Sequence, residues 1–243
     1  MTPPASRLGN PGSPGNAAGL PTGAAAHAGG GGRERPRFIA VEGPIGAGKS
    51  TLARLLAESL GARLVEEKPE ENPFLGPFYA DPTRNALSVQ LCFLLQRYAQ
   101  QADLAQEDLF AQGGVVADYL FAKDRLFATM NLPPAEFALY DRIYTTLAPR
   151  AVAPDLVVYL QARTEVLLQR ISHRGRREEA PIAADYIRKV AESYAEFFFN
   201  YNDSPLLIVN ASDIDIVSNT DDRRALIDVI RRTKGGINHW SRS

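Results

Sequence analysis

The sequence predicts an α/β fold in which a five-stranded parallel β-sheet is covered by helices on both faces. Five short apolar runs alternate along the chain with longer helical patterns, which is typical of successive β-α-β units. The runs are apolar throughout and do not alternate with polar residues, as expected for strands buried on both faces. Ligands of such sheets bind at the carboxyl ends of the strands, so functional residues are expected directly after each run.

The expected elements follow one another at short intervals. The strands are expected at residues 38–41, 63–65, 115–117, 156–160 and 206–209. The helical patterns lie at residues 50–60, 82–111, 121–130, 134–149, 164–173, 183–201 and 221–232. Gly61 follows the first helical pattern, and glycine is typical of the residue that ends a helix. Residues 67–80 contain Pro, Asn and Gly and are expected to form a loop.

Both ends of the chain are expected to lie outside the folded domain. Residues 1–36 hold nine of the 19 Gly and six of the 17 Pro and show no apolar periodicity, so we expect a disordered Gly/Pro/Ala-rich tail. Residues 37–234 are enough for one domain with a sizeable core. Residues 235–243 are expected to be a C-terminal tail.

Charge and hydropathy exclude several classes of protein. The net charge of −1 excludes a basic surface spread over the whole chain, so we expect no nucleic-acid partner. No apolar run reaches about 18 residues, so we expect no membrane span. The N-terminal residues lack the apolar middle region of a secretory signal, and we therefore expect a cytoplasmic protein.

A glycine-rich motif follows the first expected strand. Its residues match G-x-x-x-x-G-K-[ST] in full and are Gly43, Pro44, Ile45, Gly46, Ala47, Gly48, Lys49 and Ser50. In such a loop the backbone N–H groups surround phosphate oxygens, the lysine neutralises the β- and γ-phosphates, and the serine hydroxyl binds Mg²⁺. Together with Thr51, these residues are expected to bind a nucleoside triphosphate. The motif does not identify the group that receives the phosphate.

Carboxylates follow the next two expected strands. Glu66 and Glu67 come after the second strand, and a carboxylate there could accept a proton from an attacking hydroxyl. The alternative is a solvated acidic turn. Asp118 ends the third strand and could bind Mg²⁺ with Ser50, in the manner of a Walker B acid. The alternative for Asp118 is the N-cap of a helix.

The long helical pattern contains two polar residues within its apolar face. Gln90 and Arg97 are seven residues apart, which places them within about 20° of each other around a helix. A buried amide and a buried guanidinium need polar partners. Glutamine can pair with the edge of a nucleobase, and the alternative is a polar pair satisfied within the protein.

A cluster of arginines follows the fourth expected strand, at Arg170, Arg174, Arg176 and Arg177. Mobile arginines that close over a transferring phosphoryl group are a recurrent device of phosphotransferases. Because the cluster is on the connection after the fourth strand, in a chain that also has a phosphate loop, we expect an arginine-rich lid. The alternative is a solvated charged face.

Jointly, these residues resemble the deoxynucleoside kinase family, which contains the deoxycytidine, deoxyguanosine and deoxyadenosine kinases. The resemblance runs from about residue 38 to residue 210 and is closest to the bacterial deoxyadenosine/deoxyguanosine type. The catalytic carboxylate of the family lies five residues before an Asn-Pro pair, which here selects Glu67 before Asn72 and Pro73. The family's sugar-contacting tyrosine precedes its base-reading glutamine by eleven residues, which selects Tyr79 and Gln90.

The resemblance extends to the helix and the lid. The family's helix arginine comes seven residues after the glutamine, at Arg97. The lid is similar to the family pattern R-x-x-x-R-x-R-x-E-E, and its residues here are Arg170, Arg174, Arg176, Glu178 and Glu179. By resemblance, Glu179 contacts the sugar 3′-hydroxyl, and Asp124, in the pair with Arg125, helps to select the base.

The resemblance implies a P-loop kinase fold, with ATP and Mg²⁺ as cofactors. It implies phosphorylation of the 5′-hydroxyl of a deoxynucleoside, purines favoured, in nucleotide salvage, by a homodimer. Glu67 would deprotonate the hydroxyl, while Lys49 and the lid arginines neutralise charge. Two alternatives stay open: a nucleoside monophosphate kinase similar to thymidylate kinase, and a catalytically weak regulatory protein that binds nucleotides.

One residue departs from the family pattern. The family has an arginine directly after the acid of the third strand, and this chain has Tyr119 there. Two nearby cations, Lys123 and Arg125, could supply the missing charge. They differ by about 200° around a helix, so they cannot both face the site. The match of Asp124-Arg125 to the family's Asp-Arg pair favours Arg125 as the catalytic cation.

Overall fold

The computed structural model describes residues 37–106, 114–176, 179 and 182–242. The expected tail at residues 1–36 lies outside this part of the chain, and so does the expected end of the long helix at residue 111.

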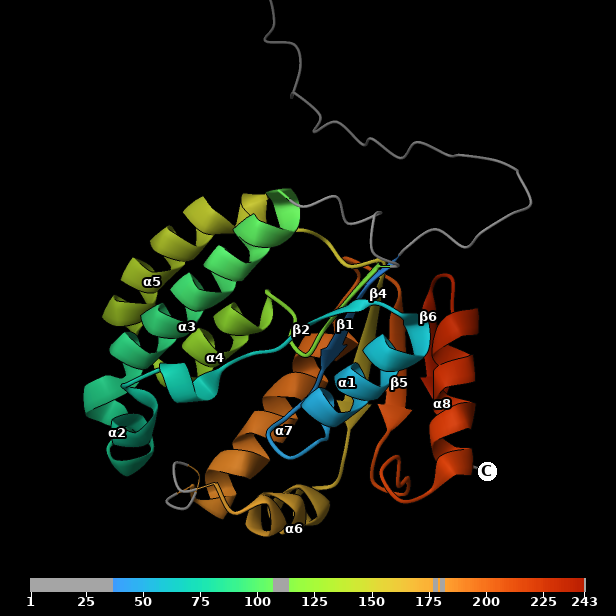
Figure 1. The fold of residues 1–243 in the computed structure, drawn as a ribbon. Helices are drawn as coiled ribbons and strands as arrows, with labels where there is room; N and C mark the ends of the chain where they lie inside the picture. Colours follow the sequence, from blue (N-terminus) through green and yellow to red (C-terminus); the bar gives the residue numbers. More distant parts are fainter. Residues whose placement is uncertain (1–36, 107–113, 177–178, 180–181, 243) are drawn as a thin grey trace, which may run out of the picture. The chain divides into compact units, whose positions relative to one another are not determined.

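A parallel sheet forms the centre of the fold (Figure 1). Its strands are β1 (Arg37–Glu42), β2 (Arg63–Val65), β3 (Gly114–Ala117), β4 (Leu156–Gln161), β5 (Leu206–Asn210) and β6 (Ile237–Trp240). They lie in the order β2-β3-β1-β4-β5-β6, and every neighbouring pair is parallel. The expected parallel sheet with helices on both faces is confirmed, with six strands in place of five.

The additional strand, β6, corrects the expected C-terminal tail. Leu206 is in register with Ile237, and Val209 with Trp240, so the segment extends the sheet at its edge. The residues of β6 are half-buried or exposed, and two of its four residues are polar. A short edge strand of this kind has no continuous apolar run, which is why the apolar pattern of the sequence did not indicate it.

Eight helices lie in the described part of the chain. They are α1 (Lys49–Leu60), α2 (Leu75–Ala80), α3 (Pro82–Gln106), α4 (Lys123–Asn131), α5 (Pro134–Leu147), α6 (Thr164–Arg174), α7 (Ala184–Phe199) and α8 (Thr220–Arg232). Gly61 ends α1 in the left-handed conformation, with φ 62°, as expected. None of these helices is long and apolar enough to cross a membrane.

Helix α2 is a second correction, because residues 67–80 were expected to form a loop. Its Pro77 lies in the first turn, where the missing N–H costs no helical hydrogen bond. Leu75 and Phe78 are buried against α3, so tertiary packing stabilises a helix that the local composition disfavours.

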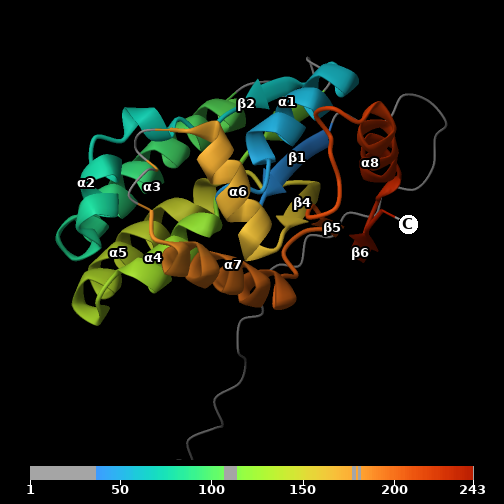
Figure 2. The ribbon, with the colours of Figure 1, turned by 90° about the horizontal axis from the view of Figure 1, so that it is seen from below.

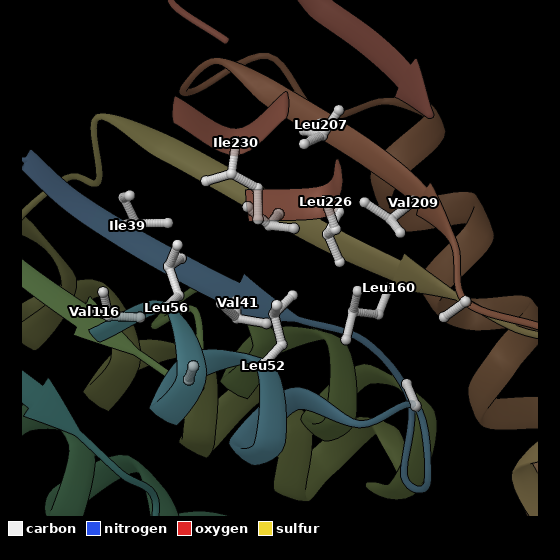
Figure 3. Close-up of a cluster of buried hydrophobic side chains, with 14 of the residues drawn as sticks. Ile39, Val41, Leu52, Leu56, Val116, Leu160, Leu207, Val209, Leu226 and Ile230 are labelled. Carbon is white, nitrogen blue, oxygen red and sulfur yellow. The ribbon is translucent and has the colours of Figure 1, made fainter. Parts of the chain in front are cut away.

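Alternate side chains of the strands pack against helices on opposite faces of the sheet. Ile39 and Val41 point to the face covered by α1 and α8, where Leu52, Leu56, Leu226 and Ile230 complete a buried cluster (Figure 3). Ala40 and Tyr159 point to the other face, where they pack against α7. Helices α2 to α5 pack with one another in a further cluster, beside the β2 edge of the sheet (Figures 1 and 2).

The order of the strands determines where the site lies. Strand β1 lies between β3 and β4, so the chain leaves β1 at the point where the strand order reverses, and the carboxyl ends of the strands form a crevice there. The segments that follow β1, β2 and β3 carry the glycine-rich loop, Glu67 and Asp118. Residues far apart in the sequence are thereby brought together.

Candidate active site

The glycine-rich loop joins β1 to α1, and its three glycines have positive φ angles that L-residues rarely adopt. Gly46 has φ 85°, and a Cβ atom there would lie 2.7 Å from the carbonyl oxygen of Leu167 on α6. Gly48 has φ 102° directly before the first turn of α1. That turn contains Lys49, Ser50 and Thr51, so their backbone N–H groups belong to the positive end of the helix dipole.

The side chain of Lys49 lies along the glycine-rich loop. Its Nζ donates hydrogen bonds to the carbonyl oxygens of Gly43 at 2.8 Å and Pro44 at 3.2 Å. Burial, together with the neighbouring charge of Lys123, lowers the pKa of Lys49. The loop therefore holds a cation at the N-terminus of a helix, which is an arrangement that binds phosphate.

Ser50 and Asp118 provide the oxygen atoms that a Mg²⁺ site needs. The Ser50 hydroxyl donates to Oδ2 of Asp118 at 2.5 Å, and burial raises the pKa of Asp118. The described residues contain no cluster of three or more His, Cys, Asp or Glu that could hold a metal ion. One hydroxyl and one carboxylate nevertheless fit Mg²⁺, because this ion binds through one or two protein oxygens and takes its other ligands from phosphates and water.

Glu67 lies beside this pair, and two cations contact its carboxylate. Its backbone N–H donates to Oδ1 of Asp118 at 2.6 Å. Oε1 accepts a hydrogen bond from the Arg97 guanidinium, and Oε2 accepts one from Nζ of Lys123 at 2.9 Å. Burial acts to raise the pKa of Glu67, but Arg97 and Lys123 outweigh it and hold the pKa well below its usual range. The carboxylate is therefore ionised at neutral pH.

Arg97 joins Glu67 to a second, fully buried carboxylate. A second nitrogen of its guanidinium donates to Oδ1 of Asp124 on α4, while Oδ2 of Asp124 has no partner in the described part of the chain. Burial raises the pKa of Asp124 to about 6, although Arg97 and Lys123 act in the opposite direction. Both terminal nitrogens of the buried guanidinium on α3 thus have carboxylate partners, while its Nε has none in the described part of the chain.

Apart from the fully buried Asp124, the charged groups just described line one cavity, whose wall also contains residues of α2 and α7. The described residues with side chains or backbone on its wall include Gly46, Lys49, Ser50, Glu67, Tyr79, Gln90, Arg97, Asp118, Lys123, Arg174, Arg176 and Glu179. The wall thus combines residues of the phosphate loop with Tyr79 of α2 and Gln90 of α3. The Tyr79 ring contacts the Tyr186 ring of α7 edge to face, with a centroid distance of 6.3 Å.

The arginines expected to form a lid lie in different environments. Arg174 forms an ion pair with Glu179, and both line the cavity, as does the exposed Arg176. Arg170 departs from the expectation, because it donates to the carbonyl oxygens of Ala47, Ala211 and Ile214. It is not among the described residues on the cavity wall. Its hydrogen bonds connect the glycine-rich loop to the β5–α8 connection. Arg177 lies outside the described residues.

The structure corrects the choice of Arg125 over Lys123. Arg125 is on the outer side of α4, where its Nε donates to Asp141 of α5 at 2.8 Å and its side chain is 56% exposed. Lys123 is on the inner side, where its side chain is 4% exposed and contacts Glu67. Lys123 and Arg125 lie on opposite sides of α4, as helix geometry requires. The packing of α4 places Lys123, and not Arg125, on the side that faces the cavity.

Two further residues of the site were not selected from the sequence. Glu42, at the end of β1, is fully buried and accepts hydrogen bonds from the backbone of Gly43 at 3.0 Å and Leu120 at 2.6 Å. It also accepts one from the Tyr194 hydroxyl of α7 at 2.9 Å. In the sequence, Glu42 is an acidic residue at the end of a buried apolar strand, directly before the glycine-rich loop. That position could have indicated its role. The contact of Tyr186 with Tyr79 had no signal in the sequence.

Comparison with known proteins agrees with this geometry. The family model described as deoxynucleoside kinase matches residues 39–233. The deoxyguanosine kinase of Bacillus subtilis (strain 168) is 36% identical to the chain over 157 residues, which are 65% of this chain and 76% of that protein. The deoxyadenosine kinase of Lactobacillus acidophilus is 31% identical over 208 residues, with 80% of this chain and 94% of that protein covered.

A solved structure shares the fold as well. The structure of deoxyadenosine kinase from M. mycoides with bound dCTP aligns with a TM-score of 0.69 and 25% sequence identity, over 80% of this chain and 98% of that one. The family model alone covers most of the chain, including the glycine-rich loop and the segments that carry Glu67, Asp118 and the arginines. The chain therefore belongs to the deoxynucleoside kinase family.

Proposed function

We propose that this protein transfers the γ-phosphoryl group of ATP to the 5′-hydroxyl of a deoxynucleoside, with purine deoxynucleosides preferred, in nucleotide salvage. The observation that carries the proposal is the position of Glu67. An ionised carboxylate lies in the same cavity as a phosphate-binding loop, and two cations hold it at both oxygens. A carboxylate that stays ionised can orient the hydroxyl and accept its proton during transfer.

The residues of the glycine-rich loop and their neighbours support the role of ATP. Gly46 and Gly48 allow the backbone to surround the phosphates, and Lys49 would neutralise the β- and γ-phosphate charge. Ser50 and Asp118 would hold Mg²⁺, which when bound neutralises phosphate charge as the γ-phosphoryl group is transferred. Arg174 and Arg176 are on the wall of the cavity, where they would contact the transferred group.

Polar and aromatic residues on the cavity wall support a nucleoside as the acceptor. Gln90, a residue that is 4% exposed, would read the base through its side-chain amide, because glutamine can pair with a base edge. Tyr79 and Glu179 would hold the sugar hydroxyl, since the carboxylate of Glu179 is on the cavity wall and is already paired with Arg174. The relatives named above are deoxyguanosine and deoxyadenosine kinases, which supports the preference for purines.

A panel of acceptors tests the proposal. The protein is incubated with ATP and Mg²⁺ and with each of the four deoxynucleosides, their ribonucleoside counterparts, and dTMP, and the products are separated by chromatography. We expect 5′-monophosphates of the deoxynucleosides, with the purines turned over best. Turnover of dTMP alone would indicate a nucleoside monophosphate kinase. Nucleotide binding without turnover of any acceptor would indicate a regulatory protein.

A further inference from the structure

Lys123 is a cation of the cavity that belongs neither to the phosphate loop nor to the arginine lid. It is the first residue of α4, its side chain is 4% exposed, and its Nζ donates to Oε2 of Glu67 at 2.9 Å. It lines the same cavity as Lys49 and Ser50. A buried ammonium loses much of its hydration, so a buried lysine is retained where a partner compensates for that loss, and here the partner is Glu67.

We propose that Lys123 is a positioning residue that fixes the orientation of the Glu67 carboxylate for phosphoryl transfer, an inference that rests on the function proposed above. Arg97 holds one carboxylate oxygen and Lys123 the other. A carboxylate that is held at one oxygen can rotate about its terminal bond, whereas one held at both oxygens has a fixed plane. The aligned base then needs no reorientation when the hydroxyl arrives.

The backbone that carries Lys123 is fixed relative to the phosphate loop. The N–H of Lys123 donates to the carbonyl oxygen of Leu120 at 3.1 Å, and the N–H of Leu120 donates to Glu42. The same Glu42 carboxylate accepts from the N–H of Gly43, where the loop begins. One buried acid thus ties together the turn that carries Lys123 and the loop that would bind the phosphates.

The two neighbouring candidates for this role point elsewhere. The Tyr119 hydroxyl is 3.5 Å from the side-chain amide of Gln101, and Tyr119 is not among the described residues that line the cavity. Arg125 pairs with Asp141 on the outside of α4. Lys123 is therefore the residue that brings a positive charge from this segment to Glu67.

Steady-state kinetics of three variants test the proposal. Lys123→Met removes the charge and keeps the length of the side chain, Lys123→Arg keeps the charge, and Arg125→Met is the matched control on the outer side of the same helix. We expect Lys123→Met to lower kcat about 10- to 100-fold while the KM values for ATP and deoxynucleoside change by no more than a few fold, since a misplaced reacting group affects the chemical step. Lys123→Arg should recover most of the loss, and Arg125→Met should match wild type.

A double-mutant cycle shows whether Lys123 acts through Glu67. In the Glu67→Gln background, Lys123→Met should cost little further activity, because the carboxylate that the lysine positions is no longer there. If Lys123→Met alone does not fold, the double variant removes both partners of the ion pair, and its comparison with Glu67→Gln still decides the question. The proposal would be overturned if the losses in activity of the two single variants multiplied in the double variant. It would also be overturned if Lys123→Met changed only the KM for ATP.

The same measurements separate this inference from the proposed function. Wild-type turnover of deoxynucleosides together with a Lys123→Met variant as active as Arg125→Met would overturn the role of Lys123 and leave the kinase function intact. Absence of deoxynucleoside turnover in the wild type would overturn both.

Discussion

Ser50 and Asp118 are 68 positions apart in the chain, and the hydroxyl of the serine donates to the carboxylate of the aspartate at 2.5 Å. The pair joins the first turn of α1 to the end of β3, so its geometry depends on the pairing of β1 with β3. The other oxygen of Asp118 accepts from the N–H of Glu67, which follows β2. One side chain thus aligns the segments that follow three different strands.

The first prediction concerns this pair. Asp118→Asn and Ser50→Ala each remove an oxygen that would hold Mg²⁺, so the Mg²⁺ concentration for half-maximal activity should rise by about 10- to 100-fold. The measurement is a Mg²⁺ titration of the initial rate at saturating ATP and deoxynucleoside. Ser50→Thr retains the hydroxyl and should stay near wild type. An unchanged Mg²⁺ requirement in both of the first two variants would exclude this pair as the metal site.

The second prediction concerns Lys49. Lys49→Ala removes a cation from the place where the β- and γ-phosphates would bind, and the loss in kcat should be on the order of 10²–10³-fold. The fold should be retained, because the hydrogen bonds of the ammonium are to carbonyls of its own loop. Rates and thermal unfolding followed by circular dichroism measure the two effects. Near-normal turnover would remove the phosphate-loop assignment.

The third prediction separates the two adjacent acids after β2. Glu67→Gln keeps the shape and removes the proton acceptor, so the rate should fall on the order of 10²–10⁴-fold. Glu66 pairs with Arg54, and the side chains of this ion pair are 36% and 64% exposed, respectively. Glu66→Gln is therefore a matched control and should have little effect. If Glu66→Gln is the slower variant, the assignment of the base is displaced by one residue.

The fourth prediction concerns stability and pH. Burial raises the pKa of Asp124 to about 6, above its ordinary value of 3.8, against the opposing effect of Arg97. Between these two values the folded protein binds more protons than the unfolded chain, so this group makes stability fall as the pH rises toward neutrality. The pKa of Glu67 is lowered, so its contribution is complete above about pH 5 and does not oppose this trend.

Asp124→Asn lacks this titration. The Tm of wild type minus the Tm of Asp124→Asn should therefore be smaller at pH 7 than at pH 5, and scanning calorimetry at both pH values measures it. A difference that stays constant, or that grows with pH, would show that Asp124 is ionised throughout this range.

The fifth prediction concerns Tyr119, which takes the place of the family's arginine. The residue is 1% exposed, and the centroid of its ring lies 5.8 Å from Cζ of Arg97. Tyr119→Arg would bury a second guanidinium beside the first, and an uncompensated buried charge costs about 3–5 kcal/mol. We expect the Tm to fall by several degrees and kcat to show no gain. Tyr119→Phe, which loses only the hydroxyl, is the control; faster turnover with an unchanged Tm in Tyr119→Arg would contradict this account.

Much of the fold and of the site follows from local sequence. The apolar runs and the glycine-rich motif are continuous in the chain, so the expected strands and the loop could be located without tertiary information. The periodicity of a helix places Gln90 and Arg97 on one face, and both prove to be buried and to line the cavity. Each of these features depends on residues within one strand or a few helical turns, so the local geometry of the chain is enough to predict it.

The rest was decided by the tertiary structure. Helix periodicity showed that Lys123 and Arg125 face opposite ways, but not which of them faces inward. That depends on the packing of α4 against α3 and α7, which buries Lys123 beside Glu67 and leaves Arg125 with Asp141. In the same way, β6 is held by its pairing with the edge of β5. Arg170 contacts the phosphate loop because carbonyl groups of two distant segments, the loop and the β5–α8 connection, both lie within its reach. The sequence determined which residues carry charge and on which helical face each lies, while the contacts between elements determined which charges meet.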